Sequence, residues 1–266
     1  IARRQRQMCI RDRFNQGRFI RQNIESVLNQ GYTNFEHIII DGGSCDETIS
    51  ILKEYSHLNW VSEKDKGQSD GLNKGFRKAT GEIIVWINSD DMLAPGALHI
   101  IDNFFSNNPD KYLLTGHQVI IDGDGKKLRV LKAHPFTYDH LLNEPSSVMQ
   151  NSTVFRRSVL EDVGYLDERF HYTMDHELFV RIVRKYKSYT VDAEIGYFRV
   201  WEESKTTTSQ ICFFKELAHM KIKHHARLIS KGNVWLVWQF IKEPFKRIPG
   251  FRNLIRRIKG VELIHC

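Results

Sequence analysis

Short apolar runs alternate with helix-like stretches between residues 14 and 110. Residues 37–40 (HIII) form an apolar, β-branched run, which is typical of a buried parallel strand. Further short strands are predicted over 58–61 and 82–87, and apolar positions at helical spacing predict helices over 18–30, 48–55, 69–79 and 95–105. This alternation predicts an α/β fold with a mostly parallel central sheet, right-handed crossovers and helices on both faces.

Acidic residues follow three of these strands. Asp41 follows the first, Glu63 and Asp65 follow the second, and Asp90 and Asp91 follow the third. Ligands of open α/β sheets bind beyond the carboxyl ends of the strands. We therefore expect these carboxylates to converge on one edge of the sheet.

The second half of the sequence has a less regular pattern. A turn at 122–125 (DGDG) separates two strand-like runs, as in a hairpin. Strands are predicted over 113–121, 127–131, 148–155 and 189–200, and a helix over 175–186. We expect a catalytic domain over 14–210, an irregular start of foreign origin over 1–13, and a basic helical appendage over 211–266.

The net charge of +7 is unevenly distributed along the 266 residues. Residues 215–266 hold 12 Lys and Arg against 3 Asp and Glu, and residues 1–13 hold 5 Arg against 1 Asp, so the segment between them is acidic. A nucleic-acid-binding protein would be more uniformly basic, so no nucleic-acid partner is expected.

Cysteine spacing and hydropathy favour an intracellular location. The four cysteines form no CxxC pair, which favours free thiols in a reducing cytosol. There is no apolar run of about 18 residues and no signal-peptide pattern. We expect a cytoplasmic protein, with peripheral attachment at the inner face of the membrane left open by its basic tail.

Two adjacent carboxylates, Asp90 and Asp91, stand in the loop 88–91 (NSDD). Such carboxylates repel each other unless a cation or a donor network balances them. Mg²⁺ and Mn²⁺ fit this pattern, since Mg²⁺ is usually held by one or two carboxylates, water and substrate phosphates. Taken alone, an Asp-rich turn or helix N-cap is the commoner explanation.

Five segments, in order, resemble glycosyltransferase family 2, the inverting enzymes of the GT-A fold. They are FNQGRFIRQNIESVLNQGY (14–32), HIIIDGGSCDET (37–48), SEKDKGQSDGLNKG (62–75), ATGEIIVWINSDDMLAPGAL (79–98) and QNSTVFRRSVLEDVGYLDERFHYTMDHELFVRI (150–182). Each motif is weak alone, but five in the right order are specific. The resemblance covers roughly residues 14–200.

This resemblance implies roles for the acidic residues. Asp41 would meet the base or ribose of the nucleotide. Asp65, Asp70 and Lys74 would line the nucleotide pocket, although Lys74 also fits a solvated helix face. Asp46 would support its loop or cap the helix that follows.

The resemblance also implies a metal site and a catalytic base. Asp90 would be the principal ligand of Mg²⁺ or Mn²⁺, Asn88 stands where many relatives have the first Asp of a DxD motif, and Asp91 would be a second ligand or a support for the loop. Asp175 would take the proton of the acceptor hydroxyl in an inverting displacement, with Glu177 in reserve. The alternative for Asp175 is stabilisation of a helix N-terminus.

The chain departs from the family pattern at two places. The family has an apolar strand before its first motif, whereas residues 8–13 (MCIRDR) are polar in half of their positions, so the central strand would be missing or replaced. Trp201 stands where relatives often have a His that helps to hold metal or diphosphate, so no His ligand is expected. Lys205 could still reach a phosphate.

Residues 233–264 interleave aromatic and basic positions, broken by Pro244 and Pro249. This composition is typical of interfacial helices on an anionic membrane surface. The alternative is a pair of helices packed on the catalytic domain with a solvated basic face.

We therefore expect a metal-dependent inverting hexosyl- or N-acetylhexosaminyltransferase. Its donor would be a nucleotide-diphospho-sugar, and its acceptor a glycan or a lipid-linked molecule of cell-envelope polysaccharide synthesis. The alternatives are a nucleotidyltransferase, which would usually have a glycine-rich basic loop that this sequence lacks, and a non-catalytic membrane- or polyanion-binding protein.

Overall fold

A mixed β-sheet forms the centre of the protein in the computed structural model, which describes residues 6–11, 15–145, 148–202 and 210–242. Four parallel strands, in the order β3-β2-β1-β4, make up one half of the sheet. They are β1 (Arg6–Arg11), β2 (Phe35–Asp41), β3 (Leu58–Ser62) and β4 (Ile83–Asn88). Their connecting helices are α1 (Gly17–Leu28), α2 (Thr48–Lys53) and α3 (Gln68–Lys78). This half confirms the predicted alternation.

The other half of the sheet contains antiparallel pairs. Beyond β4 the order is β8-β6-β9-β5, and β7 pairs with β6. The strands β5, β7 and β8 pair antiparallel to their neighbours, whereas β6 and β9 are parallel. The bounds are β5 (Met92–Leu93), β6 (Leu113–Ile121), β7 (Lys127–Leu131), β8 (Thr153–Arg156) and β9 (Ser188–Arg199). The predicted hairpin 113–131 is confirmed.

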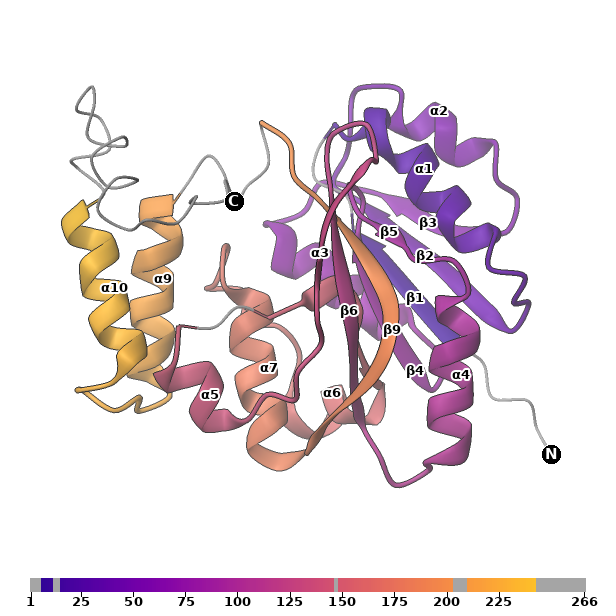
Figure 1. Ribbon diagram of the computed structural model, residues 1–266. Helices are drawn as coiled ribbons and strands as arrows, with labels where there is room; N and C mark the ends of the chain where they lie inside the picture. The colour runs from indigo at the N-terminus through magenta and orange to yellow at the C-terminus, as the bar shows by residue number, and fades with distance from the viewer. Residues whose placement is uncertain (1–5, 12–14, 146–147, 203–209, 243–266) are drawn as a thin grey trace.

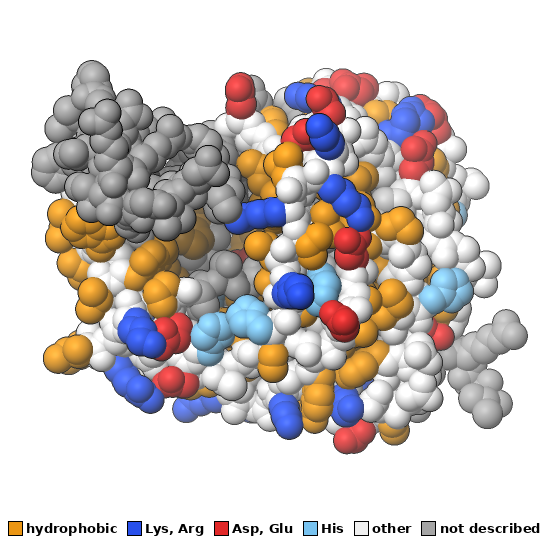
Figure 2. Space-filling model, in the orientation of Figure 1, with side chains coloured by type: hydrophobic (Ala, Val, Ile, Leu, Met, Phe, Trp, Pro, Cys, Tyr) orange, Lys and Arg blue, Asp and Glu red, His pale blue; other side chains and the backbone are white. Residues whose placement is uncertain are grey.

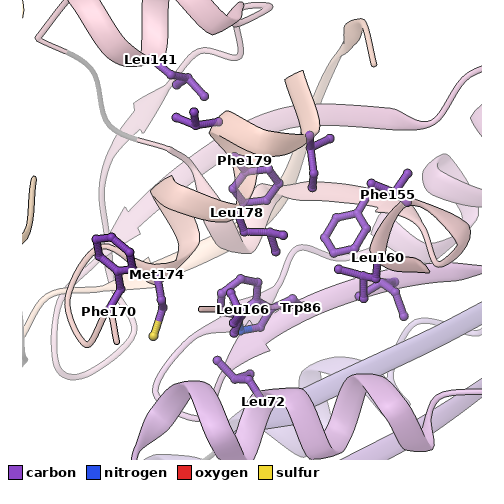
Figure 3. Close-up of a cluster of buried hydrophobic side chains, with 14 of the residues drawn as sticks. Leu72, Trp86, Leu141, Phe155, Leu160, Leu166, Phe170, Met174, Leu178 and Phe179 are labelled. Carbon is purple, nitrogen blue, oxygen red and sulfur yellow. The ribbon is translucent and has the colours of Figure 1, made fainter. Parts of the chain in front are cut away.

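Helices cover both faces of the sheet, as expected (Figure 1). Alternate residues of β4 enter different cores: Ile84 and Trp86 face one, and Ile83 and Val85 face the other. The helices α1, α2 and α4 (Ala97–Asn107) pack on the second core. The first core lies under α3, α5 (Tyr138–Asn143), α6 (Ser158–Val163) and α7 (Met174–Lys185), and is dense in aromatic rings (Figure 3).

The expectation of an irregular start without a central strand is wrong for residues 6–11. These residues form β1, which pairs with β2 from Arg6↔Phe35 to Arg11↔Ile40 and with β4 on its other side. Backbone hydrogen bonds to a strand on each side hold a segment whose composition, RQMCIR, is too polar to read as a central parallel strand. The sheet therefore begins before Phe14.

The C-terminal part contains two helices, α9 (Gln210–Lys223) and α10 (Lys231–Lys242). Figure 1 shows them side by side next to α5 and α7. Phe214, Leu217 and Met220 of α9 and Leu236 of α10 belong to the first core. No described helix is both long and apolar enough to cross a membrane. Residues 243–266, including Pro244 and Pro249, lie outside the described residues, as does Lys205.

Candidate active site

Strand register brings two of the predicted loops to one edge of the sheet. Ile40 of β2 pairs with Arg11 of β1, and Arg11 pairs with Asn88 of β4. Asp41 and the loop that follows Asn88 therefore lie at the same edge, one strand apart. This arrangement confirms the expected convergence for these two loops.

Asp41 is fully buried and holds its own loop together. Its Oδ2 accepts hydrogen bonds from the backbone N–H groups of Gly43 (3.0 Å) and Ser44 (2.9 Å), and from the Ser62 hydroxyl (2.6 Å). Its Oδ1 accepts one from the Ser44 hydroxyl (2.6 Å). With both oxygens engaged, Asp41 fixes the β2–α2 loop against β3.

Asp46 joins this loop to the start of α1. Its carboxylate accepts hydrogen bonds from the Gly17 N–H (2.8 Å) and the Thr48 N–H (3.1 Å). Burial opposes the charged form of Asp46, but these hydrogen bonds outweigh it and lower its pKa. A Cβ at position 17 would displace the exposed side chain of Glu47. Both roles predicted for Asp46 match this geometry, because the bond from Gly17 supports the loop and the bond from Thr48 lies at the start of α2.

Asp65, Asp70 and Lys74 surround the start of α3. Asp65 accepts a hydrogen bond from the Gly67 N–H (2.9 Å), and Asp70 accepts one from the Lys66 N–H (3.0 Å). Lys74 Nζ lies 3.3 Å from Asp70 and 2.8 Å from Glu63. The Lys66 N–H and the Lys74 ammonium hold the pKa of Asp70 below its usual range. The structure thus brings Asp70 and Lys74 together.

Amide side chains hold the loop after β4 in place by hydrogen bonds. Asn23 of α1 donates hydrogen bonds to the carbonyl oxygens of Asn88 (2.8 Å) and Asp91 (2.9 Å). The Asn88 amide donates to Gln150 Oε1 (3.1 Å), and Gln150 donates to the Trp86 carbonyl (2.6 Å). The backbone of the loop is therefore tied both to α1 and to the turn that precedes β8.

Asp91 points inward from this loop and is 1% exposed. Its Oδ1 accepts a hydrogen bond from the Arg199 backbone N–H (3.0 Å). Burial, followed by the charge of Asp90, raises the pKa of Asp91 well above its usual range. Of the two roles that the sequence left open, these contacts favour support of the loop.

Asp90 remains partly exposed and receives a neutral donor. The indole Nε1–H of Trp201 donates to Asp90 Oδ2 at 3.1 Å, and the Trp201 ring packs edge-on against Phe19. Trp201 thus contacts Asp90, the carboxylate that the sequence predicts to bind the metal. The carboxylate of Asp90 forms no ion pair within the described residues.

Arg199, which the motif analysis missed, holds the surroundings of Asp90 together. Its guanidinium donates to the carbonyl oxygens of Asp90 (2.8 Å) and Gly123 (2.8 Å), and to Gln22 Oε1 (2.7 Å). The group lies 4.7 Å from the centre of the Phe19 ring. One buried side chain therefore joins α1, the Asp90 loop and the β6–β7 turn. A single arginine at the end of a predicted strand carries no signal of this role in the sequence.

The residues around Asp90 fit a divalent cation that is held mainly by substrate phosphates and only in part by protein side chains. Within the described ranges, no group of three or more His, Cys, Asp and Glu residues could hold a metal ion by itself. Asp90 offers a partly exposed carboxylate, and the Asn88 Oδ1 in the same loop is buried without a hydrogen-bond partner. Mg²⁺ is commonly bound through one or two carboxylates plus substrate phosphates, and this loop provides such a set.

Asp175 lies in the first turn of α7, where its Oδ1 accepts a hydrogen bond from the His176 N–H (2.7 Å). The segment that leads into α7 packs on the start of α3. Ser69 Oγ donates to the Phe170 carbonyl (2.8 Å), and a Cβ at Gly67 would lie 3.6 Å from the His171 ring. The start of α7 therefore adjoins the 65–70 segment at the edge of the sheet.

Glu177, the reserve candidate for the base, is buried inside an ion network. It is 0% exposed and accepts hydrogen bonds from Arg181 (2.8 Å), Lys223 (2.6 Å) and His224 (3.0 Å). Burial opposes its charged form, but the hydrogen bonds from His224 and Arg181 prevail and lower the pKa of Glu177 to about 2. A carboxylate held in this way acts as a structural anchor, and the reserve role is set aside.

Known proteins resemble this chain both in sequence and in fold. The poly(ribitol-phosphate) beta-N-acetylglucosaminyltransferase TarP of Staphylococcus aureus is 26% identical over 70% of this chain and 60% of its own length. The minor teichoic acid biosynthesis protein GgaB of Bacillus subtilis is 24% identical over 86% of this chain and 28% of its own. The chain spans less than two thirds of the length of the curated relatives it matches.

Two solved structures share the fold. S. aureus TarS 1–349 in complex with UDP-GlcNAc superposes with a TM-score of 0.64 at 17% identity, covering 92% of this chain and 75% of that one. The mannosyltransferase PcManGT of Pyrobaculum calidifontis, in complex with GDP-Man and Mn²⁺, also gives 0.64 at 17% identity, covering 90% and 70%. The fold is thus of the GT-A type. The family model of glycosyl transferase family 2 matches residues 13–164, more than half of the chain, and the protein belongs to that family.

Proposed function

We propose that this protein transfers a sugar, with inversion, from a nucleotide-diphospho-sugar to an acceptor hydroxyl. The proposal rests mainly on Asp90, whose loop is fixed on three sides while its carboxylate stays partly exposed at the carboxyl edge of the sheet. A divalent cation bound there would offset the charge of the leaving diphosphate. Asp90 would hold that cation with the Asn88 Oδ1 beside it, and Asp91 would keep the loop in place.

The other carboxylates divide between binding and support. Asp65, Asp70 and Lys74 lie at the start of α3 and would line the nucleotide pocket. Asp41, with both oxygens engaged by its own loop, would shape the wall on which the base or ribose rests. Lys74, which is paired with Asp70 and Glu63, would contribute its charge to the pocket as part of that network.

Asp175 would act as the base. The first turn of a helix stabilises a carboxylate, and the segment before it packs on the α3 segment that lines the donor pocket. An inverting displacement needs a base on the face opposite the leaving group, and a second wall of the pocket is a suitable place for it.

The donor that the relatives favour is UDP-GlcNAc. TarP is a beta-N-acetylglucosaminyltransferase by name, and TarS was solved with UDP-GlcNAc. The same relatives favour an acceptor in the teichoic-acid class of cell-envelope polymers, in line with the predicted envelope glycan.

Transfer from UDP-GlcNAc to a ribitol-phosphate polymer, with and without Mn²⁺, tests this proposal. We expect Mn²⁺-dependent release of UDP, and we expect Asp175→Asn to bind UDP-GlcNAc normally in calorimetry while losing transfer by about 10³-fold or more. Loss of donor binding in Asp175→Asn would give that residue a structural role. If no sugar nucleotide of a UDP and GDP panel is turned over, the glycosyltransferase proposal fails, and pyrophosphate release from nucleoside triphosphates would support a nucleotidyltransferase.

The C-terminal helices would dock on an anionic membrane. Val234, Val237, Trp238 and Ile241 follow helical spacing on α10, and each is 47–65% exposed. Figure 2 shows hydrophobic side chains gathered on this side of the molecule. The sequence of 243–266 adds six Lys and Arg, and a combination of exposed apolar and basic residues fits an interfacial contact. The full chain should sediment with phosphatidylglycerol vesicles, and Val237→Asp with Trp238→Asp should release it; unchanged sedimentation would reject the proposal.

A further inference from the structure

A carboxylate of α9 binds the backbone at the start of α7. Glu216 accepts hydrogen bonds from the N–H groups of three successive residues: His171 (2.9 Å), Tyr172 (2.7 Å) and Thr173 (3.1 Å). The separation in sequence is 43 to 45 residues. These contacts are therefore tertiary and fix α9 on the segment that leads into α7.

Glu216 binds the backbone just before the first turn of α7. The first turn of a helix leaves backbone N–H groups without partners, and a side chain at the N-cap usually accepts one of them. Thr173 is the N-cap of α7, and its side chain forms no such hydrogen bond. Glu216 binds the three N–H groups that precede the first turn, and its negative charge interacts favourably with the positive end of the helix dipole.

A second contact holds α7 further along its length. Lys223 and His224, at the end of α9, bind the buried carboxylate of Glu177 at 2.6 Å and 3.0 Å. Between the two contacts, Phe214, Leu217 and Met220 are buried in the core shared with α7. With two polar contacts and an apolar seam, α9 fixes both the position and the rotation of α7.

We infer that α9 belongs to the catalytic unit and that Glu216 is a positioning residue for Asp175. The inference rests on the proposed function, in which Asp175 is the base. Asp175 stands two residues after Thr173, or roughly 3 Å along the helix axis, so a movement of the segment 171–173 moves Asp175 with it. A displacement of about 1 Å can cost about 10²-fold in rate.

The charge of Glu216 gives the inference a specific signature. A nearby negative charge favours the protonated form of a carboxyl group and strengthens it as a base. Removal of that charge should lower the apparent pKa of the base. The acid limb of the pH profile of kcat should then move to lower pH, a change that a purely structural role would not cause.

The test compares Glu216→Gln with Glu216→Asp and with Lys215→Gln, which changes an exposed neighbour on α9. We expect Glu216→Gln to lower kcat by about 10- to 100-fold and to shift the acid limb downward. Donor KM and UDP-GlcNAc affinity should stay within about twofold of wild type. Glu216→Asp should recover the pH profile and part of kcat, and Lys215→Gln should behave as wild type.

Two outcomes separate this inference from the function on which it rests. If Asp175→Asn retains transfer, the assignment of the base fails, whatever Glu216→Gln does. If Asp175→Asn is inactive while Glu216→Gln keeps the wild-type kcat and pH profile, the positioning role is overturned. Should Glu216→Gln not fold, Glu216→Asp decides: an unchanged kcat at a carboxylate one methylene shorter also overturns it.

Discussion

Asp90 and Glu177 are both carboxylates held by hydrogen bonds, but they differ in burial and in the charge of their partners. Glu177 is fully buried at the α7–α9 junction and is bound by Arg181, Lys223 and His224. Asp90 is partly exposed at the edge of the sheet, and the donor to its carboxylate is the neutral indole of Trp201. Cationic side chains balance the charge of Glu177, whereas no Lys or Arg of the described residues forms an ion pair with the carboxylate of Asp90.

This difference shows how two carboxylates can be assigned to different tasks. Burying a charge is unfavourable unless cations and hydrogen bonds offset it, so a fully paired carboxylate stabilises the fold and has little left for a ligand. Asp41 lies between the two cases, because it is buried but balanced by backbone and hydroxyl donors instead of cations. Substitution of Asp90 at the edge of the sheet should therefore reduce activity, whereas substitution of Glu177 at the α7–α9 junction should reduce stability.

The largest effect is expected for Asp90→Asn. The amide keeps the size of the side chain but removes the charge that would hold the cation, so transfer should fall by about 10³-fold or more. The free energy of unfolding should change by less than about 1 kcal/mol, because the side chain is partly exposed. Urea unfolding and a transfer assay measure the two quantities. If Asp90→Asn retained transfer, Asp90 would not be a ligand of the proposed metal site.

Glu177→Gln should show the opposite behaviour. Removal of this charge leaves Arg181 without a carboxylate partner and Lys223 with Asp167 alone, which should cost about 3 kcal/mol of unfolding free energy. UDP-GlcNAc affinity of the folded variant should match that of wild type. The control is Glu161→Gln, which removes an exposed ion pair with Arg157 and should lower the unfolding free energy by less than about 1 kcal/mol. Equal losses of unfolding free energy in Glu177→Gln and Glu161→Gln would contradict the expected difference between the buried and the exposed ion pair.

As the pH falls, the α7–α9 junction should lose stability before Glu177 becomes protonated. Burial lowers the pKa of His176 to about 4. Since the unfolded state takes up a proton near pH 6.5 and the folded state only near pH 4, stability should fall as pH drops through this window, by about 2–3 kcal/mol. His37, with a pKa lowered by burial to about 3, adds to the loss in the same window.

His176→Asn should reduce this pH dependence. The slope of unfolding free energy against pH between 6.5 and 4 should decrease, while His99→Asn, an exposed site, should leave the slope unchanged. The stabilising effect of the charged Glu177, whose pKa is about 2, is lost only between pH 4.5 and 2. A wild-type slope in His176→Asn would mean that another group controls acid unfolding.

The parallel half of the fold could be predicted because its signals are local. Apolar β-branched runs and helical spacing located β2, β3, β4 and the helices between them to within about two residues. The strand β1 was missed because half of RQMCIR is polar and the strand is defined by pairing on both sides. The position of β8 between β4 and β6 depends on contacts that no local pattern reports.

The candidate site could be predicted only in part, for the same reason. Motifs indicated Asp90 and its loop as a candidate site, because these residues are close in sequence. The contacts of Arg199 with Gln22, Asp90 and Gly123 join residues separated by 76 to 177 positions, and those of Glu216 with the start of α7 span more than 40. Such pairings follow from the folded topology and could not be predicted from one sequence.

The smallest effect is expected for Trp201→Phe, which tests how the exposed carboxylate is oriented. The ring should remain packed against Phe19, and only the N–H bound to Asp90 Oδ2 is lost. Hydrogen bonds to a metal-binding carboxylate typically change metal affinity by about 10-fold or more. We therefore expect calorimetry in the presence of UDP to show about 10-fold weaker Mn²⁺ binding, whereas Trp60→Phe on β3 should bind Mn²⁺ as wild type does. Equal affinities in the two variants would show that the indole packs beside Asp90 without orienting it, and that Arg199 and Asn23 suffice to position this loop.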